Sequence, residues 1–106
     1  MNEQMTAIYP EYLLKTAEYD FGTDLNGFLL DVRDLEEGVC GVLFYDSRQE
    51  HSDGTTITTE PILELYLHHG FEVILTKAKR RYVVVSRMLM IEMNGTTTIY
   101  RMVGPV

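Results

Sequence analysis

An Asn94-Gly95 pair between two apolar-rich runs constrains the fold of this chain more than any other feature of its sequence. Asn-Gly is the dipeptide preferred by two-residue hairpin turns, because both central residues of a type I′ turn take positive φ. Residues 88–93 and 96–103 are therefore expected to pair as antiparallel strands. The expected pairs are Met93 with Thr96, Ile91 with Thr98 and Leu89 with Tyr100 on one face, and Met90 with Ile99 and Met88 with Arg101 on the other. Both faces are largely apolar, so the hairpin is expected to be central, or to be covered by an N-terminal helix or by a second copy of the protein.

Residues 39–87 predict further strands. The run VCGVLFYD is apolar, β-branched and aromatic, and the polar stretch after it ends in Asp53-Gly54, a dipeptide typical of turns. TTITTEPILELYL continues an extended pattern in which Pro61 indicates an edge strand or a bulge; a short helix starting at Pro61 is the alternative. FEVILT and RYVVVSR flank KAKR, which predicts a hairpin with a basic tip.

One short helix is expected near the N-terminus. Pro10 suits a first helical turn, and residues 10–19 place their apolar side chains on one stripe. Residues 24–37 fit either a helix or a strand. Gly27 argues against the helix, because glycine costs about 1 kcal/mol relative to alanine in a helix interior. We favour a strand here, with Phe28, Leu30 and Val32 on one side and the sequence DLEEG as the following turn.

These elements predict the fold class. The chain has 106 residues, of which 45% are hydrophobic and 24% charged, a balance typical of a globular protein with a single core. We expect one domain, residues 1–106, of the α+β class: mainly antiparallel β in a small barrel-like or curved sheet, with one short N-terminal helix. An all-β fold with negligible helix is the alternative.

Charge is distributed unevenly in this acidic chain, whose formal net charge is −7. Residues 1–75 hold fifteen of the sixteen carboxylates and three of the nine Lys and Arg residues, whereas residues 76–106 hold one carboxylate and six cations. Opposite signs in the two parts predict either that they pack against each other or that separate faces meet different partners.

Two charged clusters are candidate binding sites. The acidic cluster contains Asp31, Asp34, Glu36 and Glu37. It is either solvated surface or a protein-binding face that imitates the field of phosphates. The basic cluster contains Lys77, Lys79, Arg80 and Arg81. It either protects a hairpin edge from aggregation, pairs with the acidic part of the chain, or contacts nucleic acid directly. Direct contact is the weakest of these, because four cations neutralise few phosphates and the rest of the chain repels them.

No pattern indicates catalysis, a metal or a cofactor. Cys40 has no Cys-x-x-Cys partner, and the adjacent His68 and His69 match no zinc spacing. Apolar neighbours favour a buried, unreactive Cys40. Asp46 and Asp53 bracket a polar loop and are interpreted as turn residues. The first fifteen residues lack a signal-peptide pattern, no apolar stretch is long enough to cross a membrane, and the single cysteine gives no sign of an oxidising compartment. We therefore expect a cytoplasmic protein without membrane contact.

Residues 41–84 carry a resemblance to known proteins. The order is a glycine, an apolar strand and Asp, then a polar loop, Asp-Gly and Ile-x-Thr, and later Val-x-x-Thr before Tyr-Val. The residues concerned are Gly41, Asp46, Asp53, Gly54, Ile57, Thr59, Val73, Thr76, Tyr82 and Val83. This pattern resembles small phage, prophage and plasmid proteins, most of which are uncharacterised, and the resemblance implies a mobile-element origin. Inhibitors of host defence, such as anti-CRISPR proteins, recur among small acidic phage proteins, and this suggests the same role by analogy.

Our functional expectation is a non-enzymatic phage or mobile-element protein that binds a host protein or nucleoprotein complex and inhibits a defence system such as CRISPR. The alternative is a small nucleic-acid-binding or regulatory module that uses the basic hairpin, residues 77–87. We also expect self-association as a homodimer, or a hetero-complex, through the C-terminal hairpin. The residues assigned to self-association are Met90, Ile91, Ile99 and Tyr100.

Overall fold

Eight strands and one short helix make up residues 7–106, the part of the chain that the computed structural model describes. In chain order they are α1 (Glu11–Thr16), β1 (Gly27–Asp34), β2 (Val39–Phe44), β3 (Thr55–Thr58), β4 (Ile62–His68), β5 (Phe71–Thr76), β6 (Arg81–Val84), β7 (Ser86–Met93) and β8 (Thr96–Val103). The expectation of no signal peptide rests partly on residues 1–6, which lie outside the described residues.

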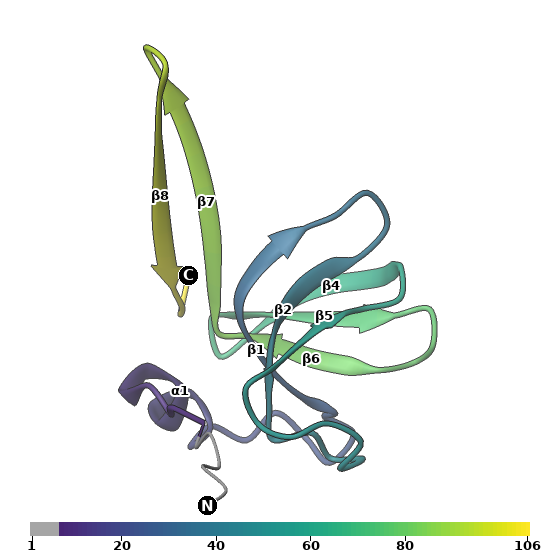
Figure 1. The fold of residues 1–106 in the computed structure, drawn as a ribbon. Helices are drawn as coiled ribbons and strands as arrows, with labels where there is room; N and C mark the ends of the chain where they lie inside the picture. The colour runs from purple at the N-terminus through teal and green to yellow at the C-terminus, as the bar shows by residue number, and fades with distance from the viewer. Residues whose placement is uncertain (1–6) are drawn as a thin grey trace, which may run out of the picture.

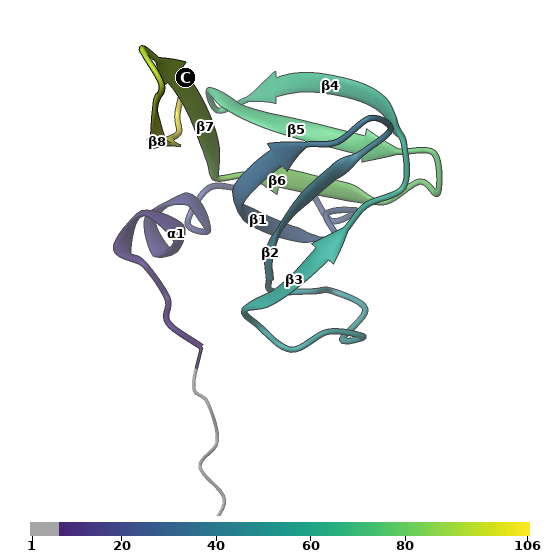
Figure 2. The same cartoon turned by 45° about the horizontal axis from the view of Figure 1, so that its top comes forward.

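Six strands form a curved sheet in the order β3-β2-β1-β6-β5-β4 (Figures 1 and 2). All neighbours in this order are antiparallel except β1 and β6, which pair in parallel through Gly27–Leu29 and Tyr82–Val84. The edges β3 and β4 do not pair with each other, so the sheet is curved without closing. The α+β prediction of a mainly antiparallel curved sheet with one short helix is therefore confirmed.

Alternate residues of these strands fill two separate cores, one on each side of the sheet. The core on the side covered by α1, called here the helix side, contains Leu13, Phe21, Phe28, Leu30, Phe44, Phe71, Val73, Val83 and Val85. The core on the opposite, inner side contains Leu29, Val32, Val39, Leu43, Ile74, Tyr82 and Val84. The near-continuous apolar runs of β1, β5 and β6 are explained by this burial on both sides.

A β-bulge in β1 changes the side to which its last residues belong. Asp31 has φ of 54°, and the register with β2 shifts between Leu30 and Arg33. One extra residue reverses the alternation beyond it. The expected strand at 24–37 is therefore correct, but Val32 packs in the inner core and not beside Phe28 and Leu30 as predicted.

The N-terminal helix, the segment after Pro61 and the basic hairpin were also predicted from the sequence. The helix is shorter than the predicted range 10–19, because a turn follows Thr16. The alternative of a helix after Pro61 is wrong: β4 begins at Ile62, at the sheet edge, with an irregular register at its start. The basic hairpin is present as β5 and β6.

The Asn94-Gly95 hairpin is the arm of the molecule, defined here as β7 and β8. Both turn residues have positive φ, 51° and 77°, and every pair expected from the sequence is observed. Val85 alone separates β6 from β7, and β7 then pairs with β1 at a single position, Val32 with Arg87. The arm consequently leaves the sheet and projects away from it (Figure 1). The hairpin is thus neither central nor covered by α1, which packs on the helix side of the sheet instead.

Candidate functional site

The arm exposes the largest group of apolar side chains in the described part of the molecule. Eight of its large apolar residues are between 40% and 69% exposed: Leu89, Met90, Ile91, Met93, Ile99, Tyr100, Met102 and Val103. No other strand pairs with β8 among the described residues, so its outer edge also presents free backbone groups. Exposed apolar surface of this extent usually marks an interaction site.

An ion pair on the helix side fixes the base of the arm. The Arg101 guanidinium donates from Nε to Asp31 Oδ1 at 2.7 Å and from Nη2 to Asp31 Oδ2 at 3.1 Å. Ser86 adds two links: its Oγ accepts the Asp31 backbone N–H at 2.8 Å, and its hydroxyl donates to Asp31 Oδ1 at 3.3 Å. The hydrogen bonds to Asp31 raise the pKa of Arg101 further above its usual value. The bulge residue of β1 is therefore the anchor for β8.

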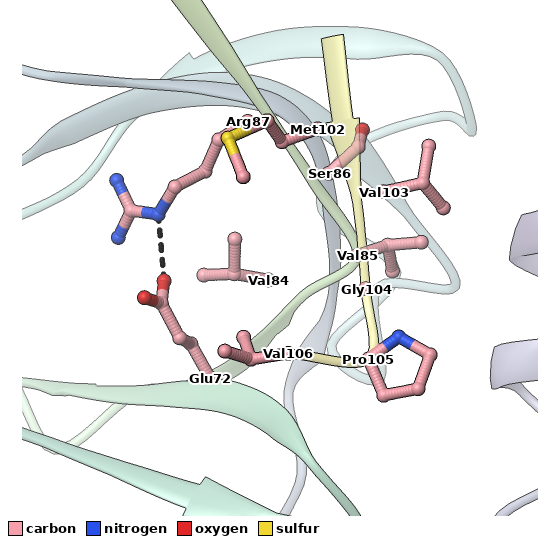
Figure 3. Close-up of a pocket in the computed structure, with 10 residues that line it drawn as sticks. All are labelled: Glu72, Val84, Val85, Ser86, Arg87, Met102, Val103, Gly104, Pro105 and Val106. Carbon is pink, nitrogen blue, oxygen red and sulfur yellow. Dashed lines mark hydrogen bonds and ion pairs between the residues drawn. The ribbon is translucent and has the colours of Figure 1, made fainter.

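A second ion-pair group fixes the arm from the inner side. Arg87 Nε donates to Glu72 Oε2 at 2.6 Å, and Arg87 Nη1 donates to Asp34 Oδ1 at 2.9 Å. Partial burial disfavours the charged form, but the two carboxylates outweigh it and raise the pKa of Arg87. Figure 3 shows the Glu72–Arg87 pair at the rim of a pocket of about 290 Å³. Val84, Met102 and the C-terminal Val106 form much of its apolar wall.

The two faces of the arm have different surroundings. Met88, Met90 and Ile99 line a hollow of about 240 Å³ opposite Arg33, Val42 and Thr56 of the curved sheet. We call this face, which also carries Arg101, the hollow face. The other face carries Leu89, Ile91, Met93, Tyr100 and Met102 and is called the open face. A further hollow of about 280 Å³, with Ile8, Pro10 and Tyr12 in its wall, shares Asp31 and Val42 with the first. The hollow face therefore borders a groove that leads toward α1.

The predicted acidic cluster is divided by the fold. Asp31 and Asp34 are used by the arginines at the base of the arm. Glu36 and Glu37 stay exposed in the β1–β2 turn, where the Leu35 N–H donates to the Gly38 carbonyl at 2.9 Å. Two of the four carboxylates therefore have internal partners, and two face solvent.

The two arginines of the predicted basic cluster are paired with the acidic part of the chain. Arg81 Nε lies 3.0 Å from Asp24 Oδ2, and Arg81 also donates to the Tyr66 hydroxyl and stacks over that ring at 5.6 Å. The Arg80 guanidinium lies 3.8 Å from Glu50. Side-chain hydrogen bonding to Tyr66 is the main cause of the raised pKa of Arg81.

The two lysines of the basic cluster differ from its arginines. Lys77 and Lys79 make no ion pair with a described residue, and Lys77 lines a shallow hollow that includes Glu36 and Glu37. Three interpretations of the basic cluster were open: edge protection, pairing with the acidic part of the chain, and contact with nucleic acid. Pairing with the acidic part applies to Arg80 and Arg81. Lys77 and Lys79 lie in the turn between β5 and β6.

Histidines and the cysteine occupy packing and turn positions. His68 and His69 stack at 4.4 Å between ring centroids and pack against Phe21. Cys40 is half-buried and not buried as expected, because its side of β2 is only partly covered, and its Sγ lies 3.9 Å from Arg33 Nη2. No group of three or more His, Cys, Asp or Glu side chains within residues 7–106 is arranged to hold a metal ion.

Asp46 and Asp53 organise the loop between β2 and β3. Asp46 accepts backbone N–H groups from Arg48, Glu50 and His51, each at 3.1 Å. Burial alone raises the pKa of Asp46, but these hydrogen bonds outweigh it and lower the pKa below its ordinary value. Asp53 accepts the Tyr45 N–H at 2.8 Å and the Tyr9 hydroxyl. The turn interpretation of both residues is confirmed.

The arginine anchors at the base of the arm were not predicted from the sequence. Ser86, Arg87 and Arg101 were not candidate site residues, although the opposite charge of the two parts of the chain indicated such pairing. The separation of the arm into two faces with different neighbours was missed as well, because it depends on where the arm leaves the sheet.

Comparison of the chain with protein-family models, with curated proteins and with solved structures found no match. The geometry of the arm and its surroundings therefore carries the functional argument. No helix within residues 7–106 is long and apolar enough to span a membrane.

Proposed function

We propose that this chain is a non-enzymatic interaction protein of a phage or another mobile element, and that it inhibits a host defence complex, such as a CRISPR complex, by binding it. The observation that carries the proposal is the arm, which is anchored to the curved sheet by ion pairs at its base while its apolar side chains remain exposed. A hairpin anchored at its base suits protein binding, because little further conformational freedom is lost when it binds.

The hollow face of the arm is the partner-binding surface in this proposal. Met88, Met90 and Ile99 border the groove, and methionine side chains adapt well to a partner's shape. Arg33 lies at the same hollow and makes no ion pair with a described residue. An apolar segment of a host protein with a neighbouring carboxylate fits this combination.

The charge of the chain favours a basic partner. The formal net charge is −7, and Glu36 and Glu37 remain solvent-exposed. Long-range attraction would speed association with proteins that handle nucleic acids, whose binding surfaces are basic. The ion pairs of Arg80, Arg81 and Arg87 weigh against the nucleic-acid-binding alternative, because these cations already have carboxylate partners.

Two measurements test the proposal together. Expression of the chain should raise the plating efficiency of a phage that the host CRISPR system targets, and a tagged chain should capture a stoichiometric host complex from the same cells. Met90→Glu should abolish both effects, because it replaces an apolar contact residue of the hollow face with a charged side chain and occupies Arg33. Leu63→Glu is the matched control, since Leu63 is an exposed apolar residue of β4, away from the arm, and should leave both unchanged.

Two outcomes would refute parts of the proposal. Unchanged plating combined with no stoichiometric partner would refute the proposed role. A captured partner that is retained equally by both variants would refute the assignment of the hollow face.

A further inference from the structure

The open face of the arm has the features of a surface that meets an identical surface. Its residues Leu89, Ile91 and Met93 alternate along β7, and Tyr100 and Met102 lie beside them on β8. These five side chains are between 40% and 66% exposed. The open face is therefore largely apolar, with Thr96 and Thr98 as its uncharged polar members, whereas the hollow face looks onto the curved sheet.

The open face also lacks unpaired charge. Its one charged residue is Arg87 at the base, and Arg87 is neutralised by Glu72 and Asp34. Glu92, the carboxylate of the arm, lies on the hollow face, since its cross-strand partner Thr97 belongs to that face. Association through the open face thus desolvates no unpaired charged group of the arm, and this removes the largest cost of burying an interface.

Further exposed apolar residues lie on the inner side of the curved sheet, beside the Glu72–Arg87 pair at the base of the arm. Leu67 pairs with Glu72, which is the carboxylate that Arg87 of the open face contacts. Leu65 pairs with Ile74 of the inner core and shares this side. Both leucines are more than half exposed. The inner side therefore offers apolar area beyond the arm itself.

We infer that two copies of this chain associate by packing the open faces of their arms against each other around a two-fold axis. Each copy presents the same uncharged layer, which is the condition for an isologous contact. Two such layers pack about 10 Å apart, as in β-sandwiches.

The area of the open face favours a second copy as the occupant, and its lack of unpaired charge permits the contact. Two chains of net charge −7 repel each other through most of their surfaces, and the projecting arm is where they can meet without opposing carboxylates. A standard interface takes about 800 Å² from each partner, and five half-exposed large side chains together with Leu65 and Leu67 provide area of that order.

This inference goes beyond the proposed function and divides the predicted self-association residues. Ile91 and Tyr100 belong to the interface, whereas Met90 and Ile99 remain on the hollow face. A dimer built in this way leaves the hollow face of each copy accessible to a host partner.

The test uses purified full-length protein alone, so its result does not depend on any host partner. Sedimentation equilibrium of the wild-type chain should show a dimer at micromolar concentration. Ile91→Asp should weaken dimerisation at least about a hundredfold, because a carboxylate from each copy is buried in the interface. The matched control is Met90→Asp, the adjacent residue on the opposite face, and it should leave the dimer unchanged.

A second matched pair protects the test against misfolding. Tyr100→Arg should dissociate the dimer and Ile99→Arg should not, and thermal unfolding followed by circular dichroism identifies any variant that has lost its fold. A monomeric wild-type chain at every concentration overturns the inference. Dissociation by the hollow-face variants, or a dimer that survives both open-face variants, overturns it equally.

Discussion

The curved sheet and the arm are built from similar β-rich, apolar sequence, yet the central strands of the sheet and the outer strand of the arm differ strongly in burial. In the curved sheet, β5 and β6 bury nearly every residue between two cores, while all eight residues of β8 are exposed. The difference arises from neighbours: β5 and β6 have a strand on each side, whereas β8 has only β7. An apolar strand is therefore fully buried where the topology supplies neighbours at both of its edges and on both of its faces.

The difference in burial between the curved sheet and the arm is tested by the same Ile→Ala substitution in each of them. Ile74→Ala should lower the free energy of unfolding by about 2–5 kcal/mol, because Ile74 is fully buried in the inner core and the change leaves a cavity. Ile99→Ala on the arm should change it by less than about 0.5 kcal/mol, since Ile99 is 58% exposed. Urea unfolding of the two variants under conditions that keep the protein monomeric measures both values. Equal losses would mean that the arm is part of the folded core.

The loop at residues 46–53 and the arm tip are secured in different ways, and the difference should appear as a dependence on pH. Asp46→Ala should lower the free energy of unfolding at pH 7 by about 1–2 kcal/mol, because three backbone N–H groups lose their acceptor. The Asp46 pKa is lower in the folded protein than in the unfolded chain. Its contribution is therefore complete above the unfolded pKa, near pH 4, and is lost as the pH falls through the lowered pKa.

Urea unfolding at pH 7 and at pH 3 measures this effect. The difference between wild type and Asp46→Ala should shrink at the lower pH. Glu92→Gln near the arm tip is the control, because Glu92 has no ion pair with a described residue, and it should alter stability little at either pH. A pH-independent difference for Asp46→Ala would contradict the role assigned to the carboxylate.

The smallest effect on global stability, but a distinct effect on dynamics, is expected at the base of the arm. Asp31→Asn removes the charge that Arg101 contacts and keeps a residue type that tolerates positive φ. Exposed ion pairs contribute at most about 1 kcal/mol, so the unfolding free energy should fall only slightly. Hydrogen exchange should nevertheless accelerate in β7 and β8 while β5 and β6 remain protected. Unchanged exchange in the arm would show that Asp31 does not anchor it.

The sequence alone was sufficient for much of the local structure. It predicted the arm's register residue by residue, because the φ requirements of Asn94-Gly95 determine the turn and the turn determines the pairs. It also favoured a strand over a helix within residues 24–37, from the cost of Gly27 in a helix interior, and the structure has β1 at Gly27–Asp34. The four self-association residues were recognised as apolar, but their division between two faces with different neighbours was not.

What the sequence determined by itself is therefore local: which segments are strands, where the tight turns fall, and that the two parts of the chain carry opposite charge. The tertiary structure decided the parallel pairing of β1 with β6, the bulge at Asp31 that moves Val32 to the inner core, and the departure of the arm from the sheet at Val85. Turn preference and strand alternation act between residues close in sequence, so they can be recognised from the sequence. The ion pair of Arg87 with Glu72 joins residues 15 positions apart, and that of Arg101 with Asp31 joins residues 70 positions apart. Such ion pairs, like the choice of neighbouring strands, form only in the folded chain.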